Sequence, residues 1–186
     1  AGINLSYEKF KDIYFSPGIS LTYDDLTTDS KASDLLKKQS GTSTDLMFDY
    51  AFSSDKRDRR FMPTAGHLTS FYQQLPLYAD QPHVKNNFST RHYKEFSEDM
   101  IGAVKFGVTA INGLNDEDVR LSQRLNLNSN KLRGVEPGKI GPKDGSDFIG
   151  GNYVSTINAT TSLPKILENV QNVDIVMFAD AANICL

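Results

Sequence analysis

The sequence predicts an all-β fold, an antiparallel up-and-down transmembrane β-barrel with about eight strands in this chain. Three observations support this prediction. Apolar and non-apolar residues alternate with a period of two along segments of strand length. The second face of these strands carries small polar residues where a water-facing sheet would carry more charge. The connections between the strands alternate between shorter and longer, as in outer-membrane barrels.

The first four predicted strands are residues 2–8, 13–24, 44–54 and 66–76. The first three alternate clearly, whereas 66–76 alternates less cleanly. Their apolar positions include Ile3, Leu5 and Tyr7, then Ile19, Leu21 and Tyr23, then Leu46, Phe48 and Tyr50.

The last four predicted strands are residues 86–96, 100–112, 152–163 and 173–184. The strand 86–96 alternates weakly and the others more clearly. Apolar positions include Val104, Phe106 and Val108, then Tyr153, Ile157 and Ala159, then Ile175, Met177 and Ala179.

Strand lengths and connections favour a membrane over water. Several segments exceed the usual strand length of ~5–6 residues, and a tilted membrane-spanning strand needs about 9–11. The predicted connections are 9–12, 25–43, 55–65, 77–85, 97–99, 113–151 and 164–172. The long segment 113–151 would lie outside the membrane or fold inward. A soluble β-sandwich that acts as a binding module is the alternative that this pattern leaves open.

Composition excludes several other classes. The net charge of −3 argues against a nucleic-acid binder, so no nucleic-acid partner is expected. The single cysteine, Cys185, excludes an internal disulfide. No apolar run reaches the ~18 residues of a membrane helix. The histidines lack metal-ligand spacing and no nucleophile is paired with a base, so we expect no enzyme, no metal and no cofactor.

Three segments carry motifs whose combination is specific. The long loop contains Leu132-Arg133-Gly134-Val135, then Gly141-Pro142, then Gly150-Gly151-Asn152 at the start of a strand. An earlier turn contains Asp55-Lys56-Arg57-Asp58 followed by Pro63-Thr64 and Gly66. A late strand contains Phe178-Ala179-Asp180. In order and spacing these segments resemble the bacterial surface antigen family, the BamA-like outer-membrane protein assembly factors.

The resemblance implies a loop latch. The loop would fold back into the barrel, where Arg133, next to Gly134, would reach Asp180 on the inner wall. A guanidinium in a partly dehydrated interior favours a bidentate carboxylate partner. The resemblance also implies a structural turn on the periplasmic side, formed by Asp55, Arg57, Pro63 and Gly66. Four positions depart from the family pattern: Val135, Thr160, Ala182 and Cys185. The attachment of the loop to the wall would therefore use fewer of the family's usual residues.

The resemblance further implies the larger context. Residues 1–186 would be the central part of a barrel of sixteen strands, a partial domain that lacks the flanking strands and periplasmic domains. The start without methionine agrees with a piece of a longer protein. The function would be to insert and assemble other β-barrel proteins in the bacterial cell outer membrane. The partners would be membrane lipid, unfolded outer-membrane proteins as clients, and periplasmic or lipoprotein accessory subunits. A polypeptide secretion transporter of the same superfamily remains the alternative within this fold.

Overall fold

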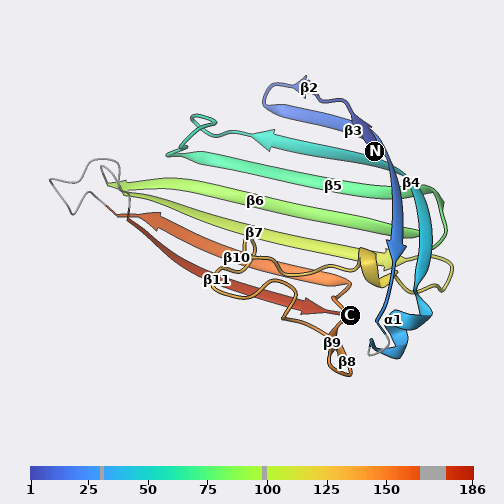
Figure 1. The fold of residues 1–186 in the computed structure, drawn as a ribbon. Coiled ribbons are helices and arrows are strands. Elements are labelled where there is room, and N and C mark those ends of the chain that lie inside the picture. Colours follow the sequence, from blue (N-terminus) through green and yellow to red (C-terminus); the bar gives the residue numbers. More distant parts are fainter. Residues whose placement is uncertain (30–31, 98–99, 164–174) are drawn as a thin grey trace.

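One curved antiparallel sheet dominates the structure, a computed structural model that describes residues 1–29, 32–97, 100–163 and 175–186. The sheet has nine strands in the order β1-β3-β4-β5-β6-β7-β10-β11, with β2 also paired to β3 (Figure 1). From β3 to β11, strand neighbours in the sheet are neighbours in the chain, apart from the insertion between β7 and β10. The predicted antiparallel, up-and-down arrangement is therefore confirmed.

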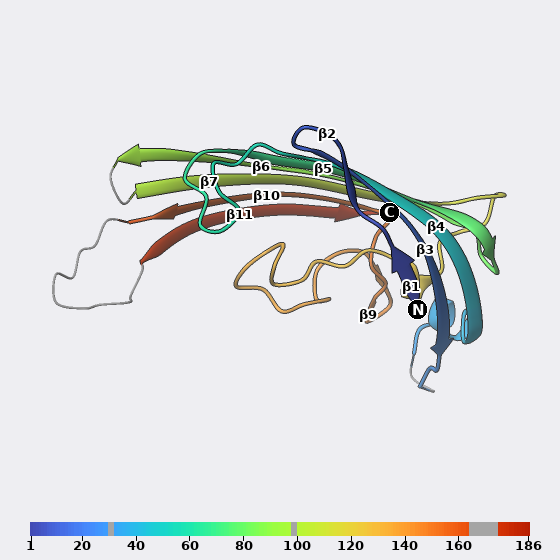
Figure 2. The ribbon, with the colours of Figure 1, turned by 90° about the horizontal axis from the view of Figure 1, so that it is seen from above.

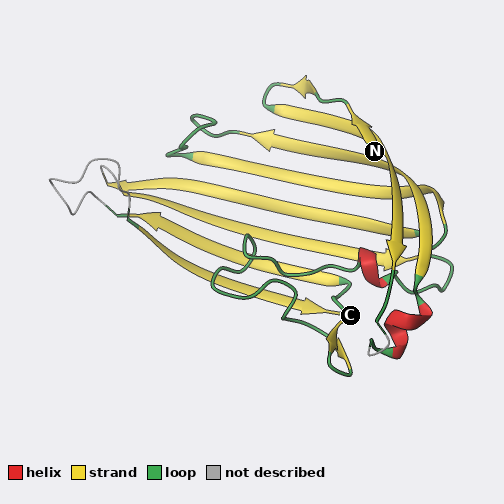
Figure 3. Ribbon diagram, in the orientation of Figure 1, coloured by secondary structure: helices red, strands yellow, loops and turns green. Residues whose placement is uncertain are grey.

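The elements have the following bounds. The strands of the main sheet are β1 (Gly2–Asn4), β2 (Tyr7–Phe10), β3 (Ile13–Leu26), β4 (Gly41–Asp55), β5 (Gly66–Ala79), β6 (His83–Ser97), β7 (Met100–Gly113), β10 (Tyr153–Ser162) and β11 (Val176–Cys185). A second, two-stranded sheet pairs β8 (Lys143–Asp144) with β9 (Asp147–Phe148). The helices are α1 (Asp34–Lys38) and a 3-10 turn, Leu121–Gln123, and both lie toward the same end of the sheet (Figure 3).

The observed strands differ from the predicted ones mainly at their ends. The predicted strand 2–8 is divided into β1 and β2, which both pair with β3. Between them Leu5 N donates to Pro17 O at 3.0 Å, but Pro17 has no N–H to return the bond, so the regular ladder is interrupted there. The first residues of the predicted strand 173–184 and the predicted connection 164–172 lie outside the described residues.

The two faces of the sheet differ in character. Seen from above, the sheet is curved and the segment between β7 and β10 lies on its concave side (Figure 2). On the opposite, convex face Val104 is 51% exposed and Ile157 is 51% exposed. Phe106 pairs directly with Ile157, so both side chains point to this face. An apolar convex face of this kind is what a hydrocarbon environment requires.

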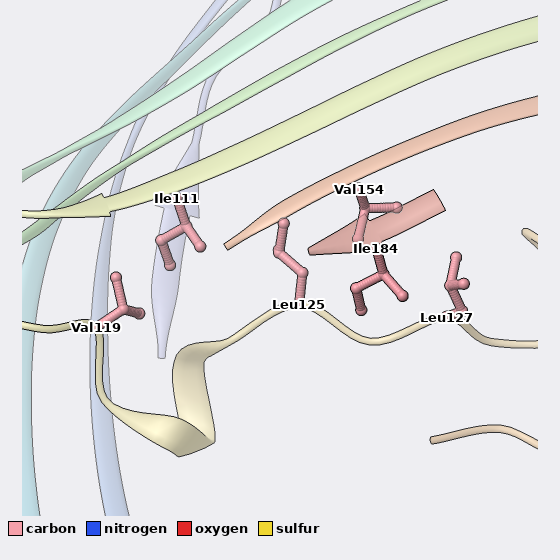
Figure 4. Close-up of a cluster of buried hydrophobic side chains, with 6 residues drawn as sticks. All are labelled: Ile111, Val119, Leu125, Leu127, Val154 and Ile184. Atoms are coloured by element: carbon pink, nitrogen blue, oxygen red, sulfur yellow. The ribbon is translucent and has the colours of Figure 1, made fainter. Parts of the chain in front are cut away.

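The buried core lies between the concave face and the long loop. Ile111, Val154 and Ile184 project from the sheet toward the loop, which contributes Val119, Leu125 and Leu127 (Figure 4). The core is thus a sheet covered by its own loop. It is not formed between two facing sheets, and the β-sandwich alternative is wrong for this part of the chain.

No helix in the described ranges is long and apolar enough to cross a membrane.

Candidate functional site

The candidate site is the long loop, residues 114–152, together with the wall beneath it. The loop is fixed near its start by two arginines that are almost fully buried. Arg120 Nη2 donates to Gly41 O at 2.6 Å, and its Nε lies 3.5 Å from Asp24 Oδ2. Arg124 Nη2 bonds to Asp118 Oδ2 at 2.7 Å. The Arg120 contacts tie the loop to the ends of β3 and β4, and the Arg124 contact braces the loop internally.

Apolar packing and a backbone bridge hold the next part of the loop. Leu125 N donates to Gly151 O at 2.8 Å, and Gly151 N donates back to Leu125 O at 2.9 Å. Leu125 and Leu127 are 6% and 4% exposed, and they pack on Ile111 and Val154. Burial of these side chains removes apolar surface from water on both the loop and the sheet, which stabilises the docked position.

Arg133 and Asp180 are in direct contact. Arg133 Nε donates to Asp180 Oδ2 at 2.6 Å, and Nη2 donates to Oδ1 at 2.5 Å. The backbone N–H of Arg133 adds a third bond to Oδ2 at 3.0 Å. The Asp180 side chain is only 3% exposed, so its carboxylate depends on these donors. A bidentate guanidinium pair fixes the orientation of the loop as well as its position.

The surroundings of the pair support the same geometry. The Arg133 guanidinium lies 3.9 Å from the centre of the Phe178 ring, a close cation–π contact. Arg133 Nη2 also lies 3.4 Å from Ala159 O and from Thr160 Oγ1. Hydrogen bonding to Asp180 raises the pKa of Arg133, so the guanidinium stays charged at any physiological pH. The hydrogen bonds to Asp180 therefore favour the charged form of Arg133.

A second contact fixes the loop just before the arginine. Asn158 Nδ2 donates to Lys131 O at 2.9 Å. Asn158 lies on β10 and pairs with Asp180 on β11 in the ladder. The loop tip is thus held by neighbouring residues of two adjacent strands.

Gly134 and the positions that depart from the family pattern have different surroundings. Gly134 has a φ of +79°, and a Cβ there would meet no atom within 4 Å, so its role is to allow the turn after Arg133. Thr160 stands near the guanidinium, where it accepts one long contact. Val135 is half-buried and Cys185 is exposed. Ala182 packs against the apolar cluster.

The predicted turn residues also lie together. Arg57 Nε and Nη2 bond to the two carboxylate oxygens of Asp55 at 2.7 Å and 2.8 Å. This hydrogen bonding raises the pKa of Arg57. Pro63 lies in the same connection and is half-buried. The ion pair closes the base of the turn where β4 ends.

Asp58 belongs to the quoted turn motif but is not one of the four predicted turn residues. It accepts from Thr64 N at 3.0 Å, Thr64 Oγ1 at 2.8 Å and Ala65 N at 3.1 Å. Gly66, at a φ of +92°, follows directly, and a Cβ there would collide with Lys56 O. Only glycine fits this close approach of the two backbones.

Each predicted site residue therefore has a definite place, and the two groups are separate. Arg133, Gly134 and Asp180 lie together at the loop tip, and Asp55, Arg57, Pro63 and Gly66 lie together in the turn. The sequence did not indicate the anchors Arg120 and Arg124. Within the described ranges no cluster of three or more His, Cys, Asp or Glu residues could hold a metal ion.

Comparisons with known proteins give the family context. The model of the Omp85 superfamily domain matches residues 1–185. A SAM50-like protein of Schizosaccharomyces pombe is 28% identical over 144 residues, which are 73% of this chain and 30% of that protein. The human sorting and assembly machinery component 50 homolog is 25% identical over 138 residues, 72% of this chain and 29% of that protein.

A solved structure matches nearly the whole chain. The crystal structure of BamA from Haemophilus ducreyi lacking POTRA domains 1–3 superposes with a TM-score of 0.84 at 20% identity. The match covers 98% of this chain and 41% of that one. This confirms the predicted BamA-like barrel fold. The chain spans less than half the length of each of these proteins.

Proposed function

The chain belongs to the Omp85 superfamily, and from this membership we propose that it forms part of an outer-membrane barrel that inserts and assembles other β-barrel proteins. An outer-membrane location follows from the family. The observation that carries the proposal is the Arg133–Asp180 contact, because it holds the long loop of a family-type barrel against the inner wall.

The proposed mechanism is non-enzymatic and uses the protein as a scaffold. The apolar convex face would lie in the hydrocarbon of the membrane, while the loop braces the concave wall from inside. Incoming strands would pair by backbone hydrogen bonds with an exposed strand edge, since every N–H and C=O must be paired in lipid. In this mechanism the present chain supplies a rigid wall and a latch.

We also propose that these residues are part of a longer barrel. The sheet in the described residues is curved, with β1 and β11 at its edges. An open edge in lipid would leave backbone groups unpaired, each at several kcal/mol. The chain also spans only 41% of the matching BamA structure. Further strands that pair with these edges would complete the sixteen-stranded barrel that we expect from the resemblance.

The particular membrane and partners are further parts of the proposal. We propose the bacterial outer membrane, although both curated relatives come from eukaryotes. The proposed partners are membrane lipid, unfolded outer-membrane proteins as clients, and periplasmic or lipoprotein accessory subunits. A secretion transporter would share this fold but would move its client across the membrane.

A reconstitution experiment tests the proposal. The full natural protein is placed in lipid vesicles, and the folding of an unfolded β-barrel client into the same vesicles is followed by gel shift without heating. We expect faster insertion than in protein-free vesicles. Asp180→Asn should slow insertion because it removes the charge that binds Arg133.

Asp116→Asn is the matched control, since Asp116 is an exposed residue of the same loop. This variant should insert the client at the wild-type rate. Wild-type vesicles that insert no faster than bare lipid would refute the assembly function. An unaltered rate in Asp180→Asn would refute the role of the latch alone. Client found inside the vesicles rather than in their membrane would favour the transporter.

A further inference from the structure

The concave wall carries basic residues that take part in none of the ion pairs found in the described part of the chain. Lys85 and Arg91 on β6 and Lys105 on β7 all point to the concave side, and Arg91 pairs directly with Lys105 in the ladder. Lys131 extends from the loop over the same area. Burial lowers the pKa of Lys131, and the nearby charges of Lys85 and Lys105 lower it further. Lys131 is therefore close enough to Lys85 and Lys105 to be repelled by both.

Carboxylates in the described ranges do not balance this cluster. Of the described ion pairs, none involves Lys85, Arg91, Lys105 or Lys131. Asp180 lies nearby, but its two oxygens are occupied by Arg133. Glu95 shares the concave face of β6 with Arg91 but lies four residues, roughly 13 Å, along the strand. Asp45 and Asp49 lie on β4, two strands away from Arg91. At about 4.8 Å per strand, that distance leaves the cations without a direct partner.

A polar pocket lies beside two of these cations, Arg91 and Lys105. It has a volume of about 230 Å³, and its lining includes Arg91, Lys105, Ser129, Asn130 and Thr160. Arginine, lysine, hydroxyl and amide groups are all hydrogen-bond donors. A water molecule takes about 30 Å³, so the pocket has room for one tetrahedral anion with several waters. Asn158 of β10 and Arg133 of the loop also line the pocket.

We propose that this pocket binds a phosphate-class oxyanion. Arg91 and Lys105 supply two positive charges side by side, which matches the charge of a phosphate group better than that of a single carboxylate. The hydroxyl and amide groups of the loop tip surround the remaining oxygens. A bound anion would also relieve the repulsion among the cations and bridge the loop to β6 and β7. The site does not depend on the assembly activity, because it is complete without a client protein.

A binding titration tests the site. The full natural protein in a maltoside detergent is titrated with inorganic phosphate, with chloride as the background anion, and binding is followed by calorimetry. We expect saturable binding. The double variant Arg91→Gln with Lys105→Gln should weaken binding at least tenfold. Removing two mutually repelling charges should leave folding intact, which the unheated gel shift verifies.

The matched control is Lys94→Gln. Lys94 lies three residues after Arg91 on β6 and therefore on the opposite face of the sheet. This variant should bind phosphate as the wild type does. A second variant, Arg91→Lys, keeps the positive charge but lacks the planar guanidinium that can donate two parallel hydrogen bonds. Its affinity for phosphate should lie between those of the wild type and the double variant.

The source of the phosphate is resolved by a parallel titration with short-chain phosphatidylglycerol. Binding of inorganic phosphate supports a free ion, and binding of the lipid alone supports a headgroup. Absence of saturation with both probes would overturn the proposal. An equal loss of affinity in Lys94→Gln and in the double variant would overturn it as well, since the effect would then be one of overall charge.

Discussion

Replacement of Leu125 by alanine should release the long loop from the sheet. Leu125 is 6% exposed and packs among Ile111, Val154 and Ile184. The change removes three carbon groups, each worth ~0.8 kcal/mol of transfer free energy, and leaves a cavity that the sheet fills only in part. We expect the docked loop to lose about 3 kcal/mol. The equilibrium constant for loop opening should therefore rise roughly 100-fold.

Amide hydrogen exchange in detergent measures this change directly. The reporters are the amides of Leu125 and Gly151, which bond to each other's carbonyls and exchange only when the loop opens. Leu114→Ala is the control, because Leu114 lies in the same loop and is 37% exposed. It should change these exchange rates little. Exchange rates in Leu125→Ala within about twofold of the wild type would refute the inference that apolar packing holds the loop.

Two further predictions concern the turn between β4 and β5. Hydrogen bonds from Ala65 and Thr64 lower the pKa of Asp58 to about 2, from the value of 3.8 in the unfolded chain. The ionised Asp58 therefore stabilises the turn above pH 3.8, and this stabilisation is lost as the pH falls through about 2. The carboxyl carbon shift of Asp58 should therefore stay constant from pH 7 to about 4, and an NMR midpoint near 4 would contradict this. Gly66→Ala should lower the thermal midpoint in detergent, because its Cβ would collide with Lys56 O. Gly145→Ala, at a φ of +60° in open space, introduces backbone strain without collision and should lower the midpoint less.

The strands were predictable because their pattern is local. A side chain on a strand faces either lipid or the interior, and this requirement alone produces the period of two seen around Phe106 and Ile157. The ends were less predictable, since a strand end depends on its partner. The break after Asn4 arises from Pro17 on the neighbouring strand, and no pattern within residues 2–8 contains that information.

The loop was harder to interpret from sequence. Its motif around Arg133 indicated the contact with Asp180 through a family resemblance, and the geometry places the two residues together. The anchors Arg120 and Arg124 have no such motif. One signal could have found them: Val119, Leu121, Leu125 and Leu127 are too apolar for a solvated loop. Their partners, such as Asp24, are distant in sequence and could not be identified.

The insertion between β7 and β10 also bears on the order in which the sheet assembles. Strands β5 and β6 are joined by residues 80–82 alone, whereas β7 and β10 meet only after the chain has returned from residues 114–152. Closing the longer connection costs about 2 kcal/mol more in conformational entropy than closing the connection of residues 80–82. Hairpins of strands joined by short connections can form early and independently, whereas β7 and β10 pair later. Docking of the loop would shorten that search, so the interior segment would bring β7 and β10 together during folding before their ladder forms.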